Sequence, residues 1–183
     1  MEKVLLRKKI AAQSIIILLS IVASVLLPEI FHLVGAVSGV GTSLGSAFLP
    51  MHLAVLFVGL IAGAVAGGIV GAVSPAISFA ISGMPAFSQM PYMCIELAIY
   101  GIVCGMLRNS KMPIVCKVIL AQAAGRILKA VLIMIAVYCF DFQAVAVLDV
   151  WYATVQGLPG ILLQLVLIPL LVFRFNGLKK YYE

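Results

Sequence analysis

The sequence is poor in charged residues. Only 10% of its 183 residues are charged, whereas 64% are hydrophobic. A soluble domain is about half apolar and about a quarter charged, so a folded globule of this composition could not hide its apolar side chains from water. The scarcity of charge therefore excludes a soluble globular protein and predicts an integral membrane protein.

The sequence also lacks the patterns that carry catalysis. Its four cysteines form no CxxC pair and no Cys/His cluster with metal-ligand spacing. It contains no HExxH motif, no Ser/His/Asp set, no Gly-rich phosphate loop and no Walker motif. We therefore expect a binding or transport protein rather than an enzyme, with no metal and no cofactor. Any ATP-driven activity would need ATPase subunits on other chains.

Apolar stretches divide the chain into spans. A helix needs about 20 apolar residues to cross the hydrocarbon core, and the apolar run 51–81 is too long for one crossing. Gly67-Gly68 lies near its centre and offers a break, which places Gly59 and Gly63 in one short helix and Gly71 in the next. The sequence thus predicts a single all-α membrane domain, a six-transmembrane-helix bundle with spans at about 10–27, 51–66, 69–82, 92–107, 114–139 and 150–173.

Proline, glycine and serine mark the predicted connections. We expect Pro28 to end the first span. The following region, 28–50, is rich in Gly and Ser and is expected to form a long external loop between the first two helices.

The basic residues fall on one side of this topology. The predicted connections 28–50, 83–91 and 140–149 contain no Lys or Arg. The positive-inside rule then places the N- and C-termini in the cytoplasm. The net charge of +6 suits contact with anionic lipid headgroups and requires no nucleic-acid partner. The basic residues at the predicted cytoplasmic face are Lys3, Arg7, Lys8, Lys9, Arg108, Lys111, Lys117, Arg174, Lys179 and Lys180.

Three ionisable residues fall inside predicted spans. Glu96 lies in the fourth span, and Arg126 and Lys129 share a face of the fifth. A charge at membrane depth costs at least about 2.5–3.5 kcal/mol, so such residues usually face a cavity or a partner. Tyr100 extends the polar face of the fourth span and Gln122 that of the fifth. Two interpretations stay open: a Glu96–Arg126 ion pair that only fixes helix packing, or a polar ligand pocket with a surplus cation, although Lys129 could instead extend outward to the interface.

Further candidates lie near the predicted outer face. His52 begins the second span and either caps it or hydrogen-bonds a ligand. Trp151 opens the last span, where it suits an aromatic belt at the interface or stacking on a flat ligand, and Gln156 lies one turn deeper. Asp141 and Asp149 are expected to be solvated in the last external loop.

Four stretches together resemble a known transporter family. They are LPMHLAVLFVGLIAGAVAGGIVGAVSPAISFAISGMP (49–85), ELAIYGIVCGML (96–107), AGRILKAV (124–131) and QGLPGILLQLVLIP (156–169). With six short helices and a long external first loop, the chain resembles the substrate-binding S-components of energy-coupling factor transporters. The resemblance covers most of the chain from Leu49 onward.

The resemblance implies a function in the bacterial plasma membrane. Such proteins bind a vitamin or its precursor at the outer face and associate with a transmembrane coupling protein and two cytoplasmic ATPases. By position, the ligand-binding residues would be His52, Glu96, Tyr100, Gln122, Arg126, Lys129, Trp151 and Gln156. A B6 vitamer or a hydroxymethylpyrimidine would suit Glu96 together with the two cations, and pantothenate or a queuosine precursor would come next.

A stand-alone secondary transporter or channel for a small polar solute is the alternative. Secondary transporters often contain matched halves with broken helices, and the glycine-rich hairpin has no counterpart in the second half of this sequence. A dependence of uptake on ATP would separate the two functions.

Overall fold

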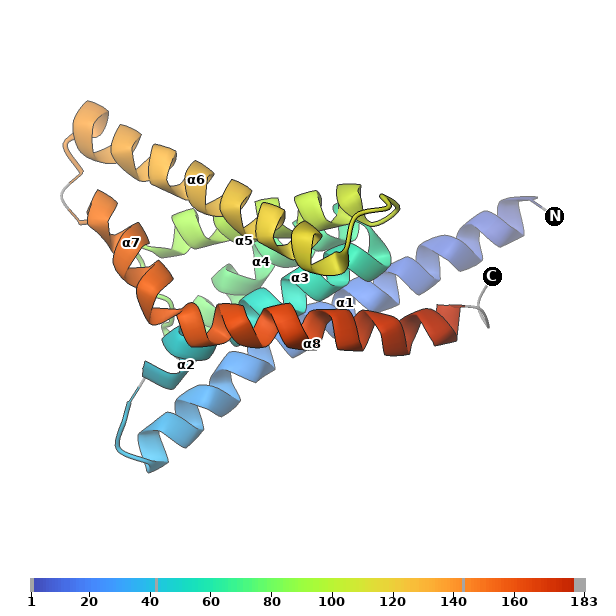
Figure 1. The fold of residues 1–183 in the computed structure, drawn as a ribbon, viewed down its shortest axis with the longest axis horizontal. Coiled ribbons are helices and arrows are strands. Elements are labelled where there is room, and N and C mark those ends of the chain that lie inside the picture. The colour runs from blue at the N-terminus through green and yellow to red at the C-terminus, as the bar shows by residue number, and fades with distance from the viewer. Residues whose placement is uncertain (1, 42, 143, 180–183) are drawn as a thin grey trace.

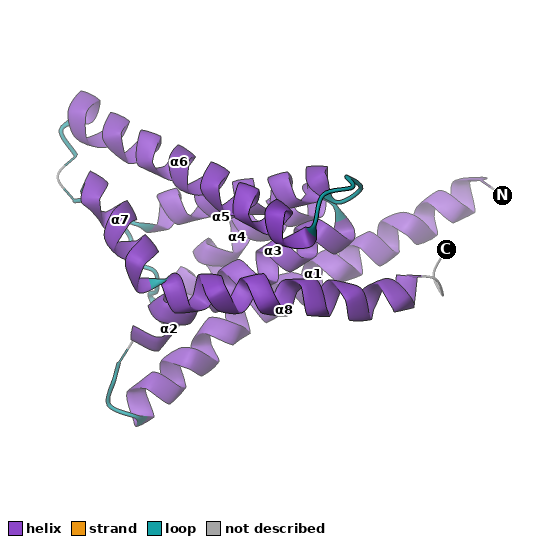
Figure 2. Cartoon of the chain, in the orientation of Figure 1, coloured by secondary structure: helices purple, strands orange, loops and turns teal. Residues whose placement is uncertain are grey.

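The computed structural model describes the backbone of residues 2–41, 43–142 and 144–179, and the side chains within these ranges from residue 13 to residue 175. Part of the predicted basic cluster, namely Lys180 and the side chains of Lys3, Arg7, Lys8, Lys9 and Lys179, lies outside the described residues. Throughout the described ranges the regular secondary structure is helical (Figures 1 and 2). The helices are α1 (Glu2–Val37), α2 (Ser43–Phe48), α3 (Pro50–Ala62), α4 (Ala64–Ser82), α5 (Met90–Leu107), α6 (Ile114–Phe140), α7 (Val147–Gln156) and α8 (Leu158–Lys179).

Six helical segments of the described chain are long and apolar enough to cross a membrane. This agrees with the predicted all-α bundle of six spans and with a multi-pass membrane protein. The start of α1 and the end of α8 lie at the same end of the bundle (Figure 1). The six segments are Gln13–Val37, Ser43–Ala62, Ala64–Ser82, Met90–Leu107, Ile114–Phe140 and Leu158–Phe175.

The first span does not end at Pro28. Helix α1 continues through this proline to Val37, and α2 and the start of α3 occupy most of the remaining residues up to 50. The predicted end at residue 27 and the predicted long loop 28–50 were therefore wrong. Proline removes one backbone donor, but membrane helices tolerate that loss where neighbouring groups satisfy the freed carbonyl, and Pro28 is buried against the rest of the bundle.

The hairpin turns at Gly63 rather than at Gly67-Gly68. Gly63 ends α3 with φ 96°, a backbone conformation that residues with a Cβ rarely adopt, and α4 begins at the next residue. Gly67 and Gly68 both lie inside α4. The predicted hairpin exists, but the predicted boundaries 51–66 and 69–82 misplaced its turn by one helical turn.

Gly67 serves helix packing instead. A Cβ built on Gly67 would lie 2.6 Å from the carbonyl oxygen of Gly101, and one built on Gly101 would overlap the backbone of Gly67. The same kind of contact joins Gly71 to the backbone of Leu97. Helices α4 and α5 thus pack backbone to backbone, as small residues allow in membrane bundles.

The predicted last span, 150–173, is two helices. Gly157 ends α7, and α8 starts at Leu158 with Pro159 in its first turn, a position where a missing backbone donor costs little. Helix α8 runs along the bundle, whereas the shorter α7 turns across the end opposite the termini (Figure 1). By contrast, α5 and α6 begin and end within two residues of the predicted 92–107 and 114–139.

Candidate functional site

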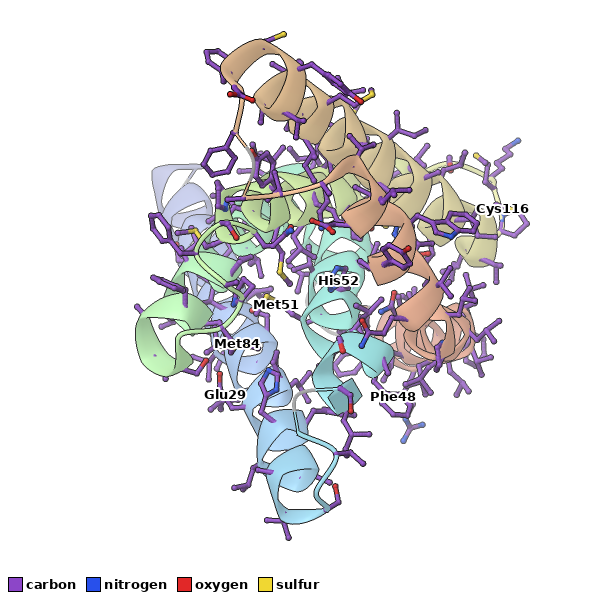
Figure 3. The ribbon with its side chains drawn as sticks, turned by 90° about the vertical axis from the view of Figure 1, so that its left-hand side faces the viewer. Glu29, Phe48, Met51, His52, Met84 and Cys116 are labelled. Atoms are coloured by element: carbon purple, nitrogen blue, oxygen red, sulfur yellow. The ribbon has the colours of Figure 1, made fainter. Side chains whose placement is uncertain are left out.

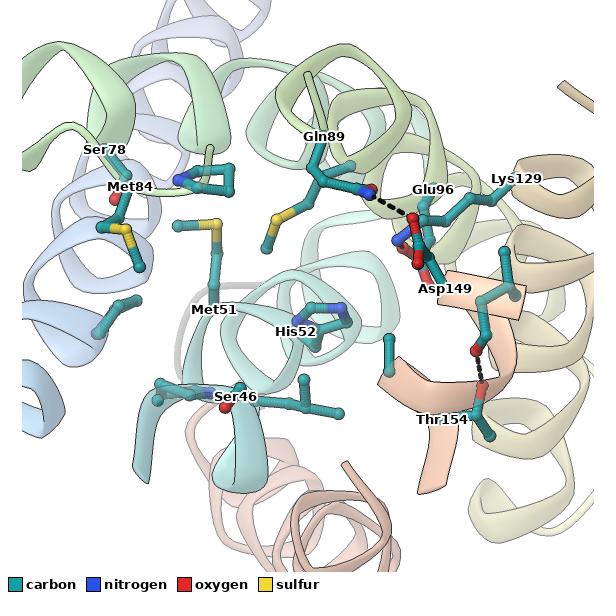
Figure 4. A pocket seen from close by; sticks show the side chains of 18 of the residues that line it. Ser46, Met51, His52, Ser78, Met84, Gln89, Glu96, Lys129, Asp149 and Thr154 are labelled. Carbon is teal, nitrogen blue, oxygen red and sulfur yellow. Dashed lines mark hydrogen bonds and ion pairs between the residues drawn. The ribbon is translucent and has the colours of Figure 1, made fainter. Parts of the chain in front are cut away.

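A cavity of about 320 Å³ lies at the end of the bundle opposite the termini. Its walls come from α1 to α7, including the connection that precedes α5 (Figures 3 and 4). Small-molecule sites typically enclose about 300–1,000 Å³, so the volume suits a compact ligand. The polar residues that line the cavity are His32, Ser46, His52, Ser78, Gln89, Glu96, Arg126, Lys129, Asp149 and Thr154.

Glu96 is the best-buried carboxylate of the described chain, with 4% of its surface exposed. Its Oε1 accepts a hydrogen bond of 2.7 Å from the Tyr100 hydroxyl, one turn along α5. Its Oε2 accepts a hydrogen bond of 2.9 Å from Lys129 Nζ on α6. Both carboxylate oxygens are therefore satisfied, which a buried charge requires.

Arg126 joins the same network through Tyr100. Its Nε donates to the Tyr100 hydroxyl at 3.0 Å and lies 3.9 Å from Glu96 Oε1. Lys129, rather than Arg126, makes the close contact with Glu96, and its side chain is 12% exposed. Lys129 therefore points into the bundle and does not extend outward to the interface.

His52 lies beside this network at the start of α3. It is 6% exposed, and its ring centroid lies 5.6 Å from that of Tyr100. Its Nδ1 is buried and has no hydrogen-bond partner among the described residues. Figure 4 shows the imidazole at the wall of the cavity, between Met51 and the α7 side. The ring therefore lines a ligand-sized space, while its Nδ1 stays enclosed by protein atoms and unsatisfied.

Asp149 lines the cavity, contrary to the prediction that it is solvated. It lies in the first turn of α7, where its Oδ2 accepts hydrogen bonds from the Ala146 backbone amide at 2.8 Å and from Gln89 Nε2 at 3.2 Å. The second bond connects α7 to the residues that precede α5 (Figure 4). Asp149 thus brings a second carboxylate to the cavity and holds α7 over it.

Gln122 belongs to a separate buried chain of hydrogen bonds. Its Nε2 donates to Gln164 Oε1 at 2.7 Å, and Gln164 Nε2 donates to the Leu49 carbonyl at 3.1 Å. Leu49 has φ 48°, an uncommon left-handed conformation for a residue with a Cβ. Gln122 is therefore placed to support the junction of α2 and α3, and it does not line the cavity.

The structure leaves two further candidates outside the cavity wall. Trp151 is 65% exposed on α7, which fits an aromatic residue at the membrane interface. Gln156 is exposed at the end of α7, and its Nε2 donates to Ser46 Oγ at 2.8 Å. The structure thus brings together His52, Glu96, Tyr100, Arg126 and Lys129, but not Gln122, Trp151 or Gln156.

Several lining residues carried little signal in the sequence. Ser46, Ser78 and Thr154 are common in membrane helices, and His32 and Gln89 stood in expected loops. Asp149 carried only a weak signal, because acidic residues are favoured in the first turn of a helix, but Ala146 lacks the side-chain acceptor that a capping box requires.

This arrangement is suited to holding a small molecule through hydrogen bonds in a partly apolar cavity. Within the described ranges, no group of three or more His, Cys, Asp and Glu side chains could hold a metal ion. No protein-family model, curated protein or solved structure matched the chain.

Proposed function

We propose that this chain binds a small water-soluble vitamin or vitamin precursor and acts as the S-component of an energy-coupling factor importer. In this proposal the ligand enters the cavity from outside a bacterial plasma membrane. A transmembrane coupling protein and two cytoplasmic ATPases then supply the energy for uptake.

The observation that carries the proposal is the cavity with its buried network. Glu96, Arg126 and Lys129 line it from two helices, and the fully buried Tyr100 hydroxyl bonds to Glu96 and Arg126 behind them. Charged groups at membrane depth usually mark a substrate path or site. A few convergent polar groups in a mostly apolar cavity are the usual composition of a ligand site.

The distribution of basic residues supports an outward-facing cavity. Arg108, Lys111 and Lys117 lie at or next to the connection between α5 and α6, near the end of the bundle that carries the termini. Lys117 Nζ donates to the carbonyls of Arg108 and Ser110 at 3.0 and 2.9 Å. The positive-inside rule favours the cytoplasm for that end and the outside for the cavity.

The lining favours a compact polar heteroaromatic ligand. Glu96 can accept from a ring N–H or amine, while Arg126 and Lys129 can donate to hydroxyl or carbonyl oxygens. Methionine sulfur makes favourable contacts with aromatic rings, and Met51, Met84 and Met93 line the same cavity. A B6 vitamer or a hydroxymethylpyrimidine meets these requirements best, followed by pantothenate or a queuosine precursor.

Uptake by reconstituted vesicles tests the energetic part of the proposal. The chain would be reconstituted with and without a coupling protein and its two ATPases. Uptake of radiolabelled pyridoxine and hydroxymethylpyrimidine would then be measured with ATP on the side of the membrane that carries the ATPases. We expect uptake only with the full complex and ATP, and none with a Walker-lysine variant of the ATPases. Uptake by the chain alone, driven by an ion gradient, would instead support a secondary transporter.

Ligand affinity tests the site. Native mass spectrometry of the protein purified in detergent would identify a co-purified small molecule, whose affinity would then be measured by calorimetry. We expect Glu96→Gln and Arg126→Ala each to abolish tight binding while the protein still folds. Full affinity in both variants would show that the network only stabilises helix packing.

A further inference from the structure

The charged side chains that line the cavity balance one another. Within the described chain, two are cationic, Arg126 and Lys129, and two are anionic, Glu96 and Asp149. Lys129 and Arg126 lie 2.9 and 3.9 Å from Glu96 oxygens. With both carboxylates counted, the cavity has no surplus cation of the kind that an anionic ligand requires.

One further carboxylate lies close to this site. Glu29 stands one turn before His32 on α1, and its Oε1 is buried without a hydrogen-bond partner among the described residues. Glu29 does not line the cavity, but an ionised Glu29 would add negative potential and oppose an anion further. Figure 3 shows Glu29 on the α1 side of the molecule, below Met84.

Two histidines of the cavity wall each leave one ring nitrogen unsatisfied. His52 Nδ1 on α3 and His32 Nδ1 on α1 are both buried and have no partner among the described residues. Each charged side chain of the wall also makes at least one hydrogen bond to a described neighbour. A neutral imidazole can donate at one ring nitrogen and accept at the other, so each histidine can meet either kind of ligand group.

We propose that the cavity selects a ligand without net negative charge, and that His32 and His52 supply its hydrogen bonds from two sides. This inference rests on the proposed function, since it defines the ligand of the same site. An anion in a charge-balanced, partly enclosed cavity would lose part of its hydration without gaining a counter-charge. An uncharged ligand loses less hydration, and a turn of either imidazole toward it would satisfy a nitrogen whose burial otherwise costs free energy.

Two matched pairs of compounds test the charge rule. Pyridoxine and pantothenol carry no net charge near pH 7, whereas 4-pyridoxate and pantothenate are anions in which a carboxylate replaces one hydroxymethyl group, so each pair has nearly the same shape. Calorimetry on the full chain in detergent would measure all four affinities. In any pair that binds, we expect the uncharged member to bind at least about 10-fold more tightly, a difference of about 1.4 kcal/mol. An anion that binds as tightly as its partner, or more tightly, would overturn the inference.

Substitutions at His52 test the hydrogen bond itself. Asparagine carries its polar atoms on Cγ, as histidine carries Nδ1, whereas the polar atoms of glutamine lie one bond further out. We expect His52→Asn to keep most of the affinity, and His52→Gln and His52→Leu to lose about 10-fold or more. The comparison between the two amides remains decisive if His52→Leu does not fold. Equal affinity in His52→Asn and His52→Gln would contradict the assignment.

His32→Leu and a core variant complete the test. We expect His32→Leu to weaken binding by a similar factor. Val55→Ala lies on the same helix as His52 and is fully buried away from the cavity, so it should lower the melting temperature without changing the affinity. Full affinity in His32→Leu would show that His32 does not bind the ligand. Failure of all four compounds, and of hydroxymethylpyrimidine and a queuosine precursor measured beside them, would contradict the proposed function and this inference together. Preference for the anions would contradict the inference alone.

Discussion

Lys129 Nζ lies 2.9 Å from Glu96 Oε2 and joins the middle of α6 to the first half of α5. Both side chains are nearly buried, with 12% and 5% of their surface exposed. The contact belongs to a network in which the Tyr100 hydroxyl also bridges Glu96 to Arg126. Removal of one charge therefore affects the partners that remain.

Glu96→Gln should destabilise the protein more than its small change in shape suggests. The substitution removes the carboxylate charge that lies within 4 Å of both Lys129 and Arg126, and breaking a buried pair typically costs about 3–5 kcal/mol. The double variant Glu96→Gln/Lys129→Met should recover part of that loss, because it removes one uncompensated cation. Thermal unfolding in detergent measures both. Equal stability of the single and double variants would show that the pair is not coupled.

Gly101→Ala should disrupt the packing of α5 on α4. A Cβ at this position would overlap the backbone of Gly67, which cannot move aside as a side chain could. We expect a loss of at least about 2 kcal/mol in the free energy of unfolding, in the range of overpacked cores. The denaturant midpoint in a fixed detergent would report it.

Gly68→Ala is the matched control for that experiment. A Cβ on Gly68 would meet only the side chain of Ile102, at 2.9 Å from its Cγ1. This side chain can rotate, and alanine favours a helix by up to about 1 kcal/mol over glycine. The stability should therefore change little. A loss equal to that of Gly101→Ala would argue against backbone contact as the cause.

Gln164→Met should cost more stability than Gln122→Met. Gln164 both accepts from Gln122 and donates to the Leu49 carbonyl, so its replacement breaks two buried hydrogen bonds, whereas replacement of Gln122 breaks one. Each buried group left unpaired costs about 1–3 kcal/mol. Hydrogen exchange at the start of α3 should increase in Gln164→Met but not in Gln122→Met. The reverse order would contradict the role assigned to Gln164.

Two native cysteines can test the orientation of the bundle. Cys116 and Cys139 are both exposed and lie near opposite ends of α6. In single-cysteine variants, a membrane-impermeant maleimide applied to intact cells should label Cys139 and spare Cys116. Both should react after the cells are permeabilised. Labelling of Cys116 alone in intact cells would place the termini outside.

Much of the helical framework could be predicted because bilayer thickness sets the length of an apolar span. Helix α5 ends and α6 begins where the apolar sequence is interrupted, at Leu107 and just after Pro113. The roles of prolines and glycines were harder to predict, since their local backbone preferences do not determine whether they end a helix or lie inside one. Pro28 lies inside a helix and Gly63, rather than Gly67, forms the turn.

The candidate site could be predicted in part for a similar reason. Glu96, Arg126 and Lys129 stand out because a charge in an apolar span is costly wherever the helices lie. The pairing of Glu96 with Lys129, the approach of Asp149 and the exposure of Trp151 depend on how α6 and α7 pack. None of these relationships has a local signal apart from the cap formed by Asp149.

The sequence by itself determined an all-helical chain with six apolar spans and three charges at membrane depth, because solvation by lipid acts on each segment separately. The tertiary structure alone decided which glycine turns and which glycines pack. It also decided that the last predicted span divides at Gly157, and that four charged side chains balance around one cavity. Those outcomes depend on contacts between segments far apart in the chain, and such contacts are settled by packing rather than by the preference of any one residue.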